Sequence, residues 1–276
     1  MFYVSGDARL FYQTLGTGPD VVLLHPTPVH HEFWMPIALG LQTDYRVTLP
    51  DLRGHGQSEA GHGVIDISRL GEDIERLLDA AHIERALFAG CSIGSYTLYE
   101  LWRRIPGRIG GLAWCCGKPQ PDTPANRAKR AEDIEKIGLD GTSEFFDRMV
   151  NTLVGKTSRA QHPEKSVQLR AMMDAATPAA VIAVQQGLAR RPDSVPSIIT
   201  VTVPALALAG AEDPGSTPEE MSVIHDLLPE SAWRVLPDAG HYAPYEQPET
   251  VGRLLREFFD GATHGHIWKI KQTRIG

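Results

Sequence analysis

A serine flanked by glycines is the first residue of the chain that could do chemistry. The stretch Gly90–Gly94 follows an apolar segment typical of a strand, residues 85–89, and precedes a helical pattern over residues 95–104. A Gly-x-Ser-x-Gly between a strand and a helix predicts a sharp turn that presents the oxygen of Ser92 as a nucleophile. Because the chain contains 26 glycines, the pattern can also arise by chance. Ser92 therefore needs partners before it predicts a reaction.

Two candidate partners follow later strands. Asp213 comes after the apolar run 204–210, and His241 comes after the strand-like run 232–236. An imidazole can take the serine proton and return it to a leaving group, while a carboxylate orients that imidazole. The order Ser92, Asp213, His241 therefore predicts a catalytic triad. Glu212 is the alternative acid, and a turn-forming or helix-capping role is the structural alternative for Asp213.

The loop after residues 21–24 could supply a hydrogen-bond donor that a serine-catalysed reaction needs. Attack by serine creates an oxyanion that two backbone N–H groups usually hold. Ile93, directly after the nucleophile, supplies the first candidate N–H. In the loop His25-Pro26-Thr27-Pro28 the prolines have no N–H to give, so Thr27 is the second candidate. The structural alternative for this loop is a rigid connector.

Three histidines gather in the same segment and raise the question of a metal. His30 and His31 are adjacent and should project in different directions, and the other candidate site residues supply no cluster of thiolates or carboxylates at ligand spacing. We therefore expect no metal and no cofactor. His30 or His31 is expected instead to line the pocket as a polar contact, and His30 is the predicted substrate contact.

Composition narrows the choice of partners. The formal net charge of −7 disfavours nucleic acid, and no apolar run approaches the length of a membrane span. Because no leader pattern is visible at the N-terminus, a cytoplasmic location is expected. Cys91, Cys115 and Cys116 are expected to be buried free thiols. A small molecule is the expected partner, and the oligomeric state stays open.

The elements that must position these residues alternate along the chain. Short apolar runs alternate with helical patterns, which predicts an α/β fold with a mainly parallel sheet covered by helices on both faces. The expected strands are residues 10–15, 21–24, 45–49, 85–89, 109–115, 204–210 and 232–236, and the expected helices are 66–81, 95–104, 218–228 and 249–259.

The alternation stops between residues 117 and 200, where the patterns are helical without a convincing strand. The expected helices are 125–137, 143–153, 163–176 and 179–189, with hydroxyl caps at Thr142 and Thr177. We predict a core of residues 1–116 and 201–261 and a helical cap of residues 117–200 inserted between core strands. Residues 262–276 are a C-terminal extension without an assigned role. An ordinary helical second domain is the alternative to the cap.

Taken together, these motifs resemble the α/β-hydrolase fold family. The similarity rests on residues 21–34, Leu49–Ser58, Gly90–Gly94, residues 210–213 and Gly240-His241. Within the family the chain looks most like 3-oxoadipate enol-lactonases and small carboxylesterases. The family usually has glycine where this chain has Pro26. The stretch Asp51–Ser58 is a family signature that we interpret as a structural turn.

The predicted function is therefore that of a serine hydrolase cleaving a small carboxylic ester or lactone through an acyl-enzyme. The predicted cap would supply an apolar pocket. The residues expected to contact substrate are His30, Trp34, Phe145, Met149, Met172 and Tyr242. The alternatives are a C–C bond hydrolase or a cofactor-free peroxidase on the same triad, and a receptor-like protein that binds without turnover.

Overall fold

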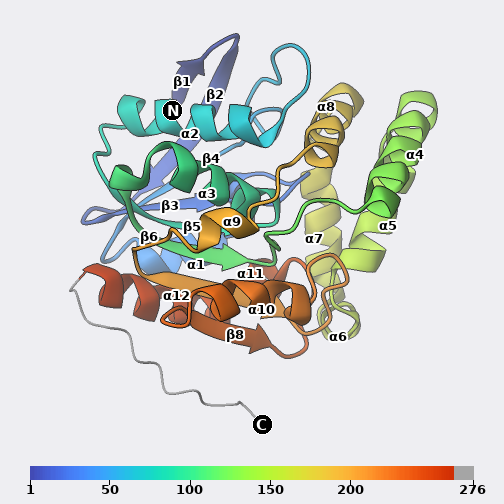
Figure 1. Ribbon diagram of the computed structural model, residues 1–276. Helices are drawn as coiled ribbons and strands as arrows, with labels where there is room; N and C mark the ends of the chain where they lie inside the picture. The colour runs from blue at the N-terminus through green and yellow to red at the C-terminus, as the bar shows by residue number, and fades with distance from the viewer. Residues whose placement is uncertain (264–276) are drawn as a thin grey trace.

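The centre of the molecule is a mostly parallel eight-stranded sheet (Figure 1). The computed structural model describes residues 1–263, so most of the predicted extension lies outside the described residues. Strands β3 to β8 pair in parallel, while β2 is antiparallel to both β1 and β4. The sheet order is β1-β2-β4-β3-β5-β6-β7-β8. The strands are β1 (Phe2–Ser5), β2 (Ala8–Leu15), β3 (Asp20–Leu24), β4 (Arg46–Pro50), β5 (Ala86–Cys91), β6 (Ile109–Cys115), β7 (Ala205–Gly210) and β8 (Ala232–Leu236).

Every strand predicted from the sequence is formed, and the fold class is confirmed. Strand β1 was missed because it is only four residues long and pairs solely with β2 at the sheet edge. The central strands β3 and β5 are buried along nearly their whole length, as continuous apolar runs covered on both faces should be.

Helices cover both faces of the sheet. On one face α2, α3, α9 and α10 pack together, and on the other α1 packs against α12. These helices are α1 (Met35–Leu41), α2 (Ile67–Ala80), α3 (Ile93–Arg104), α9 (Val195–Ile198), α10 (Pro218–Leu227) and α12 (Pro248–Thr263). The short helices η1 (His31–Trp34), η2 (Pro106–Arg108) and α11 (Ala243–Glu246) lie in connections.

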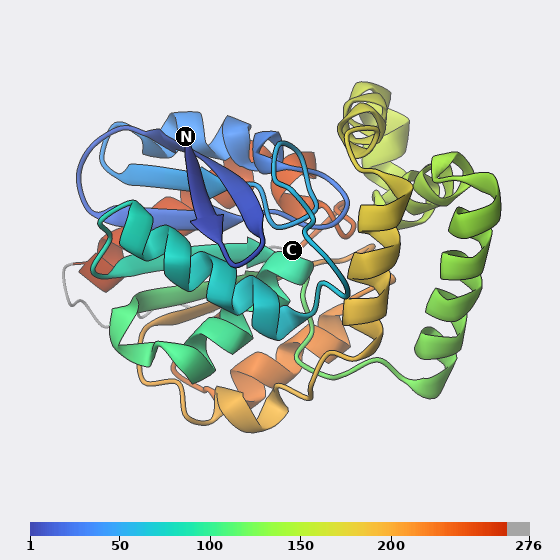
Figure 2. The ribbon, with the colours of Figure 1, turned by 90° about the horizontal axis from the view of Figure 1, so that it is seen from above.

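Five helices occupy the interval between β6 and β7. They are α4 (Pro124–Asp140), α5 (Ser143–Leu153), α6 (Lys156–Gln161), α7 (Pro163–Met173) and α8 (Pro178–Ala189). Figure 2 shows them, coloured green to yellow, standing together to one side of the sheet. We call α4–α8 the insertion. Helix α9 lies inside the predicted cap range 117–200 but packs against α3 and α10 of the core.

Local chemistry explains where several of these helices begin. The predicted cap at Thr177 is formed, since its side chain accepts from the N–H of Ala180. The predicted hydroxyl cap at Thr142 is wrong: Thr142 has helical backbone angles and its side chain makes no capping bond. The three cysteines are buried and free, as expected.

The insertion also contains two helices whose length and composition bear on a membrane span. Within residues 1–263 no single helix is long and apolar enough to cross a membrane. Helices α7 and α8 satisfy length and composition only as a pair, and they meet at a 100° bend.

Candidate active site

Ser92 occupies a strained turn between β5 and α3. Its backbone angles are φ 52° and ψ −115°, a left-handed conformation that side chains other than glycine rarely adopt. The turn is possible because the chain approaches itself closely at both neighbouring glycines. A Cβ at Gly94 would lie 2.3 Å from the carbonyl oxygen of Leu24, and one at Gly90 would lie 2.5 Å from the backbone of Gly94.

His241 and Asp213 form a buried pair beside this turn. The imidazole Nδ1 lies 2.8 Å from Asp213 Oδ2 and 3.0 Å from Oδ1. A carboxylate only accepts, so Nδ1 carries the proton and Nε2 has a free lone pair. Neither Nε2 nor the Ser92 Oγ has a hydrogen-bond partner among the described residues, and both residues line the same cavity.

The alternative acid, Glu212, faces elsewhere. Its carboxylate accepts from the N–H of Thr157, at 3.0 Å, and from that residue's hydroxyl, at 2.7 Å. Asp213 also fulfils part of its structural alternative, because Oδ1 accepts from the N–H groups of Gly215 and Ser216. The cap of α10 is Thr217, which forms a capping box with Glu220.

Glu246 was not predicted, and it organises the loop that contains His241. Its Oε2 accepts from the N–H of Gly240 and of Gly155, each at 3.0 Å, and its Oε1 accepts from the N–H of Tyr242 at 3.1 Å. Burial raises the pKa of Glu246, against the opposing effect of these three N–H groups. No spacing in the sequence points to this role, since Glu246 simply follows His241 by five residues.

The loop after β3 contains Thr27, and the Asp51–Ser58 turn supports it. Thr27 follows Pro26, and its N–H has no acceptor among the described residues. The His55 Nδ1 lies 2.9 Å from the carbonyl oxygen of Arg53 and must donate, so its Nε2 accepts from the Thr27 hydroxyl at 2.9 Å. Burial lowers the pKa of His55, which favours this neutral form. The predicted structural turn therefore also positions a candidate site residue.

Ile93 begins α3, so its N–H has no acceptor within the helix. Four residues from different loops thus meet the cavity at the carboxyl ends of the strands, namely Thr27, Ser92, Gly215 and His241. This is the edge of a parallel sheet at which ligand sites are usually built.

The cavity itself has a volume of about 430 Å³, within the range of small-molecule sites. The insertion provides its opposite wall from α4, α5 and α8. Two predicted contact residues, Phe145 and Met149, line it together with the aliphatic Leu153 and Leu188. The wall also has charged side chains that were not predicted from the sequence, namely Lys129, Arg130, Asp133 and Arg148.

Four predicted contact residues do not reach the cavity. Trp34 and Tyr242 are fully buried in the apolar core between the sheet and α12, and Met172 packs against the same core from the insertion. Large apolar side chains suit a core as well as a pocket, so a prediction from residue type alone could not distinguish the two positions. His30 lies outside the cavity lining as well.

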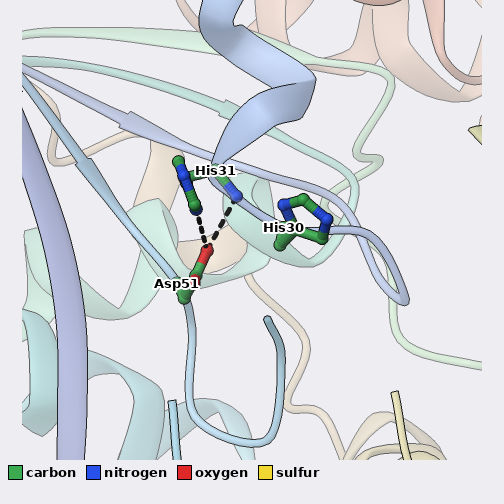
Figure 3. Close-up of side chains that lie close together, drawn as sticks. All are labelled: His30, His31 and Asp51. Carbon is green, nitrogen blue, oxygen red and sulfur yellow. Dashed lines mark hydrogen bonds and ion pairs between the residues drawn. The ribbon is translucent and has the colours of Figure 1, made fainter. Parts of the chain in front are cut away.

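His30 belongs instead to a cluster with His31 and Asp51 (Figure 3). Their nearest ligand atoms lie within 4.8 Å of one another. The sequence argument against a metal is therefore wrong on one point, because the fold brings a carboxylate to the two histidines. Asp51 Oδ1 accepts from the N–H of His31 at 2.8 Å and from its Nδ1 at 2.7 Å, and Oδ2 accepts from Gln57.

Figure 3 shows both His31 bonds converging on Asp51 while the His30 ring stands to one side. The His30 Nδ1 is buried without a partner. Asp51 Oδ1 thus joins the loop after β3 to the turn after β4, and Oδ2 is used within that turn. We interpret the cluster as a clamp between these two loops and assign it no metal.

Comparisons with known proteins agree with this architecture. A model of the alpha/beta hydrolase family matches residues 21–254. The 3-oxoadipate enol-lactonase 1 of Acinetobacter baylyi is 28% identical over 87% of this chain and 88% of its own length. A pimeloyl-acyl-carrier protein methyl ester esterase of Edwardsiella ictaluri is 28% identical over 92% of this chain and 98% of its own.

Among solved structures, a thermophilic esterase from Thermogutta terrifontis superposes with a TM-score of 0.89. It is 32% identical and covers 92% of this chain and 94% of its own. The family match, the sheet order and the strained serine turn agree, and the chain belongs to the alpha/beta hydrolase family.

Proposed function

We propose that the protein is a serine hydrolase that cleaves a small carboxylic ester or lactone through an acyl-enzyme. The observation that carries the proposal is the shared cavity: Ser92, on a turn with φ 52°, faces the same space as an imidazole whose Nδ1 is held by Asp213. The esterase and lactonase names of the relatives support ester bonds as the class of bond cleaved.

In the first half-reaction the Ser92 Oγ attacks the substrate carbonyl and its proton passes to His241 Nε2. The Asp213 carboxylate stabilises the imidazolium that forms. The oxyanion accepts from the N–H groups of Ile93 and Thr27. The loop of Thr27 is held by His55, which accepts from the Thr27 hydroxyl, and by His25, whose Nε2 accepts from the N–H of Leu52. Collapse of the intermediate expels the alcohol, which takes the proton from His241 and leaves an acyl group on Ser92.

In the second half-reaction water enters the cavity and donates its proton to His241 as it attacks the acyl group. The same two N–H groups hold the second oxyanion. Collapse returns the proton to the Ser92 Oγ and releases the carboxylic acid. Loss of one N–H donor from such a site raises the activation barrier by about 3 kcal/mol.

The insertion acts in this proposal as the cap of the site. Its helices α4, α5 and α8 form the wall that faces Ser92, so they exclude water and select substrate shape. A cavity of about 430 Å³ is large enough for a small acyl group.

The test is the release of p-nitrophenol from acetate and butyrate esters, with labelling of Ser92 by a fluorophosphonate. We expect Ser92→Ala to abolish both while circular dichroism stays unchanged. Ser68→Ala, an exposed serine on α2, is the matched control and should retain both. Unchanged turnover in Ser92→Ala would overturn the proposal.

Other outcomes separate the alternatives. Tight ligand binding without labelling or turnover would favour a receptor-like protein. Labelling without turnover of any ester or lactone would favour another bond, such as a C–C bond, as the target.

A further inference from the structure

The cavity wall opposite Ser92 contains a polar stripe of helix α4. Asn126, Lys129, Arg130 and Asp133 all line the cavity, and their spacing of three and four residues places them on one face of the helix. Helix α5 adds Arg148 with the same periodicity, between Phe145 and Thr152. The cavity is half open to solvent, and ligand cavities are lined mainly by apolar side chains, so this polar composition needs a chemical reason.

The stripe has more positive than negative charge. The lining residues include three cations, Lys129, Arg130 and Arg148, against one carboxylate of the wall, Asp133. The whole chain has a formal net charge of −7. The cationic wall therefore runs against the overall charge of the protein, as expected for a surface that meets an anion.

Ion pairs compensate this charge only in part. Lys129 lies 3.3 Å from Glu132, but each of the two buried carboxylates beside the stripe is shared by two cations. Asp133 is shared by Arg148, at 2.6 Å, and Lys129, at 3.3 Å. Asp122, buried behind the wall, is likewise shared by Arg130, at 2.5 Å, and Arg191. Each of these carboxylates thus faces two cations.

The guanidinium groups are also held in position. Arg130 donates to the side-chain oxygen of Gln185 at 2.5 Å, and Arg148 lies over the Phe145 ring, 5.4 Å from its centroid. Their side chains stay 23% and 34% exposed, so part of each group is free to meet a ligand. Ordered guanidinium groups bind carboxylates with strong, directional hydrogen bonds.

We propose that the substrate is an ester or lactone with a second anionic group, a carboxylate, which binds the Lys129, Arg130 and Arg148 wall while the scissile carbonyl lies at Ser92. This inference rests on the proposed function and names its substrate class. The apolar side chains Phe145, Met149 and Leu188 would contact the carbon chain between the two ends.

The test compares two esters that differ in one charge. Mono-p-nitrophenyl glutarate has a free carboxylate, and methyl p-nitrophenyl glutarate has a neutral ester in its place; background hydrolysis is measured with Ser92→Ala. We expect kcat/KM to be about tenfold or more higher for the charged ester, because a hydrogen bond to a charged group is worth that much. Added salt should lower the ratio of kcat/KM for the charged ester to that for the neutral ester, because it screens the exposed part of the wall.

Variants then locate the effect. Lys129→Gln and Arg148→Gln should each raise KM for the charged ester by about tenfold and change the neutral ester less than about twofold. Lys129 is half exposed, so its variant tests the wall even if loss of Arg148 destabilises the fold around Asp133. Lys136→Gln, an exposed residue of α4 outside the cavity, is the matched control and should change neither.

Two failures can be told apart. If Ser92 turns over both esters equally, and the wall variants affect both equally, the anionic substrate class is wrong while the proposed function stands. If neither ester is turned over and Ser92 is not labelled, the proposed function itself fails.

Discussion

Two histidine–aspartate pairs of nearly identical geometry lie in this molecule. His241 Nδ1 is 2.8 Å from Asp213, and His31 Nδ1 is 2.7 Å from Asp51. Both imidazoles are almost fully buried, and both follow or face the carboxyl end of a strand. Judged by their hydrogen bond alone, the two pairs would have equal claims to catalysis.

What separates them is the surroundings of the second ring nitrogen and of the carboxylate. The His241 side chain lines a cavity that is also lined by Ser92, whereas His31 lies outside this cavity. Both carboxylate oxygens of Asp51 accept from backbone N–H groups of neighbouring loops. A buried His–Asp pair by itself thus indicates only a rigid structural contact. A neighbouring nucleophile and an accessible cavity are what make the histidine a candidate general base. Four changes test this distinction.

The largest expected effect comes from Asp213→Asn. An amide cannot hold the imidazole in the same tautomer, so kcat for p-nitrophenyl butyrate should fall by about ten-thousandfold. The fold should persist, as judged by circular dichroism and thermal melting. A loss of less than about tenfold would remove Asp213 from the catalytic role.

Asp51→Asn should show the opposite pattern. The two loops lose a charged acceptor, so the free energy of unfolding should fall by about 1–3 kcal/mol. Among folded molecules kcat should stay within a few-fold of wild type, measured per site titrated with a fluorophosphonate. A collapse of kcat per titrated site, with stability unchanged, would show that the two pairs are functionally alike.

Glu246→Gln tests whether the His241 loop needs its own support. The variant amide would turn an N–H group toward the N–H donors of Gly240, Gly155 or Tyr242 and shift the loop. We expect kcat to fall by about tenfold with KM nearly unchanged. Glu249→Gln, an exposed residue at the start of α12, is the control.

A merely structural role for Glu246 predicts a different result. The number of sites titrated by a fluorophosphonate would then decrease, while kcat per titrated site would equal that of wild type.

The smallest effect concerns His25, a buried histidine without a carboxylate partner. Its Nδ1 donates to the carbonyl of Pro26 and its Nε2 accepts from the N–H of Leu52, which requires the neutral ring. Burial lowers its pKa to about 3. Below about pH 6.5 the unfolded chain binds a proton that the folded chain refuses until near pH 3, so stability falls as pH falls through this window.

The contribution of this one group is at most about 1.4 kcal/mol per pH unit. Urea unfolding at pH 7, 6 and 5 measures it against His25→Gln, which lacks the titrating ring. We expect a shallower pH dependence in the variant. Equal slopes would show that His25 titrates alike in both states.

Much of this architecture follows from sequence patterns that are local. Strand runs, helix periodicity and the order of Ser92, Asp213 and His241 predict the sheet and the residues at its carboxyl edge. The apolar contacts failed at Trp34, Met172 and Tyr242 because packing in three dimensions, not residue type, decides between core and cavity.

The supporting residues depend on contacts between distant segments. Glu246 contacts Gly155, which is 91 residues earlier in the chain, and Asp51 meets His31 across 20 residues. The helix and strand periodicity of the sequence does not predict such contacts between distant segments. The charged stripe of α4 was missed for the same reason, since its spacing of three and four residues gains meaning only beside a cavity that the fold creates.

One set of contacts has a consequence for how the molecule opens. The N–H of His241 donates to the carbonyl of Leu153 at 2.7 Å, and the N–H of Gly155 donates to Glu246, so the end of α5 is attached to the loop of the imidazole. Lifting the insertion at this end would pull His241 away from Asp213. Movement of the insertion at this end is therefore coupled to the position of the imidazole.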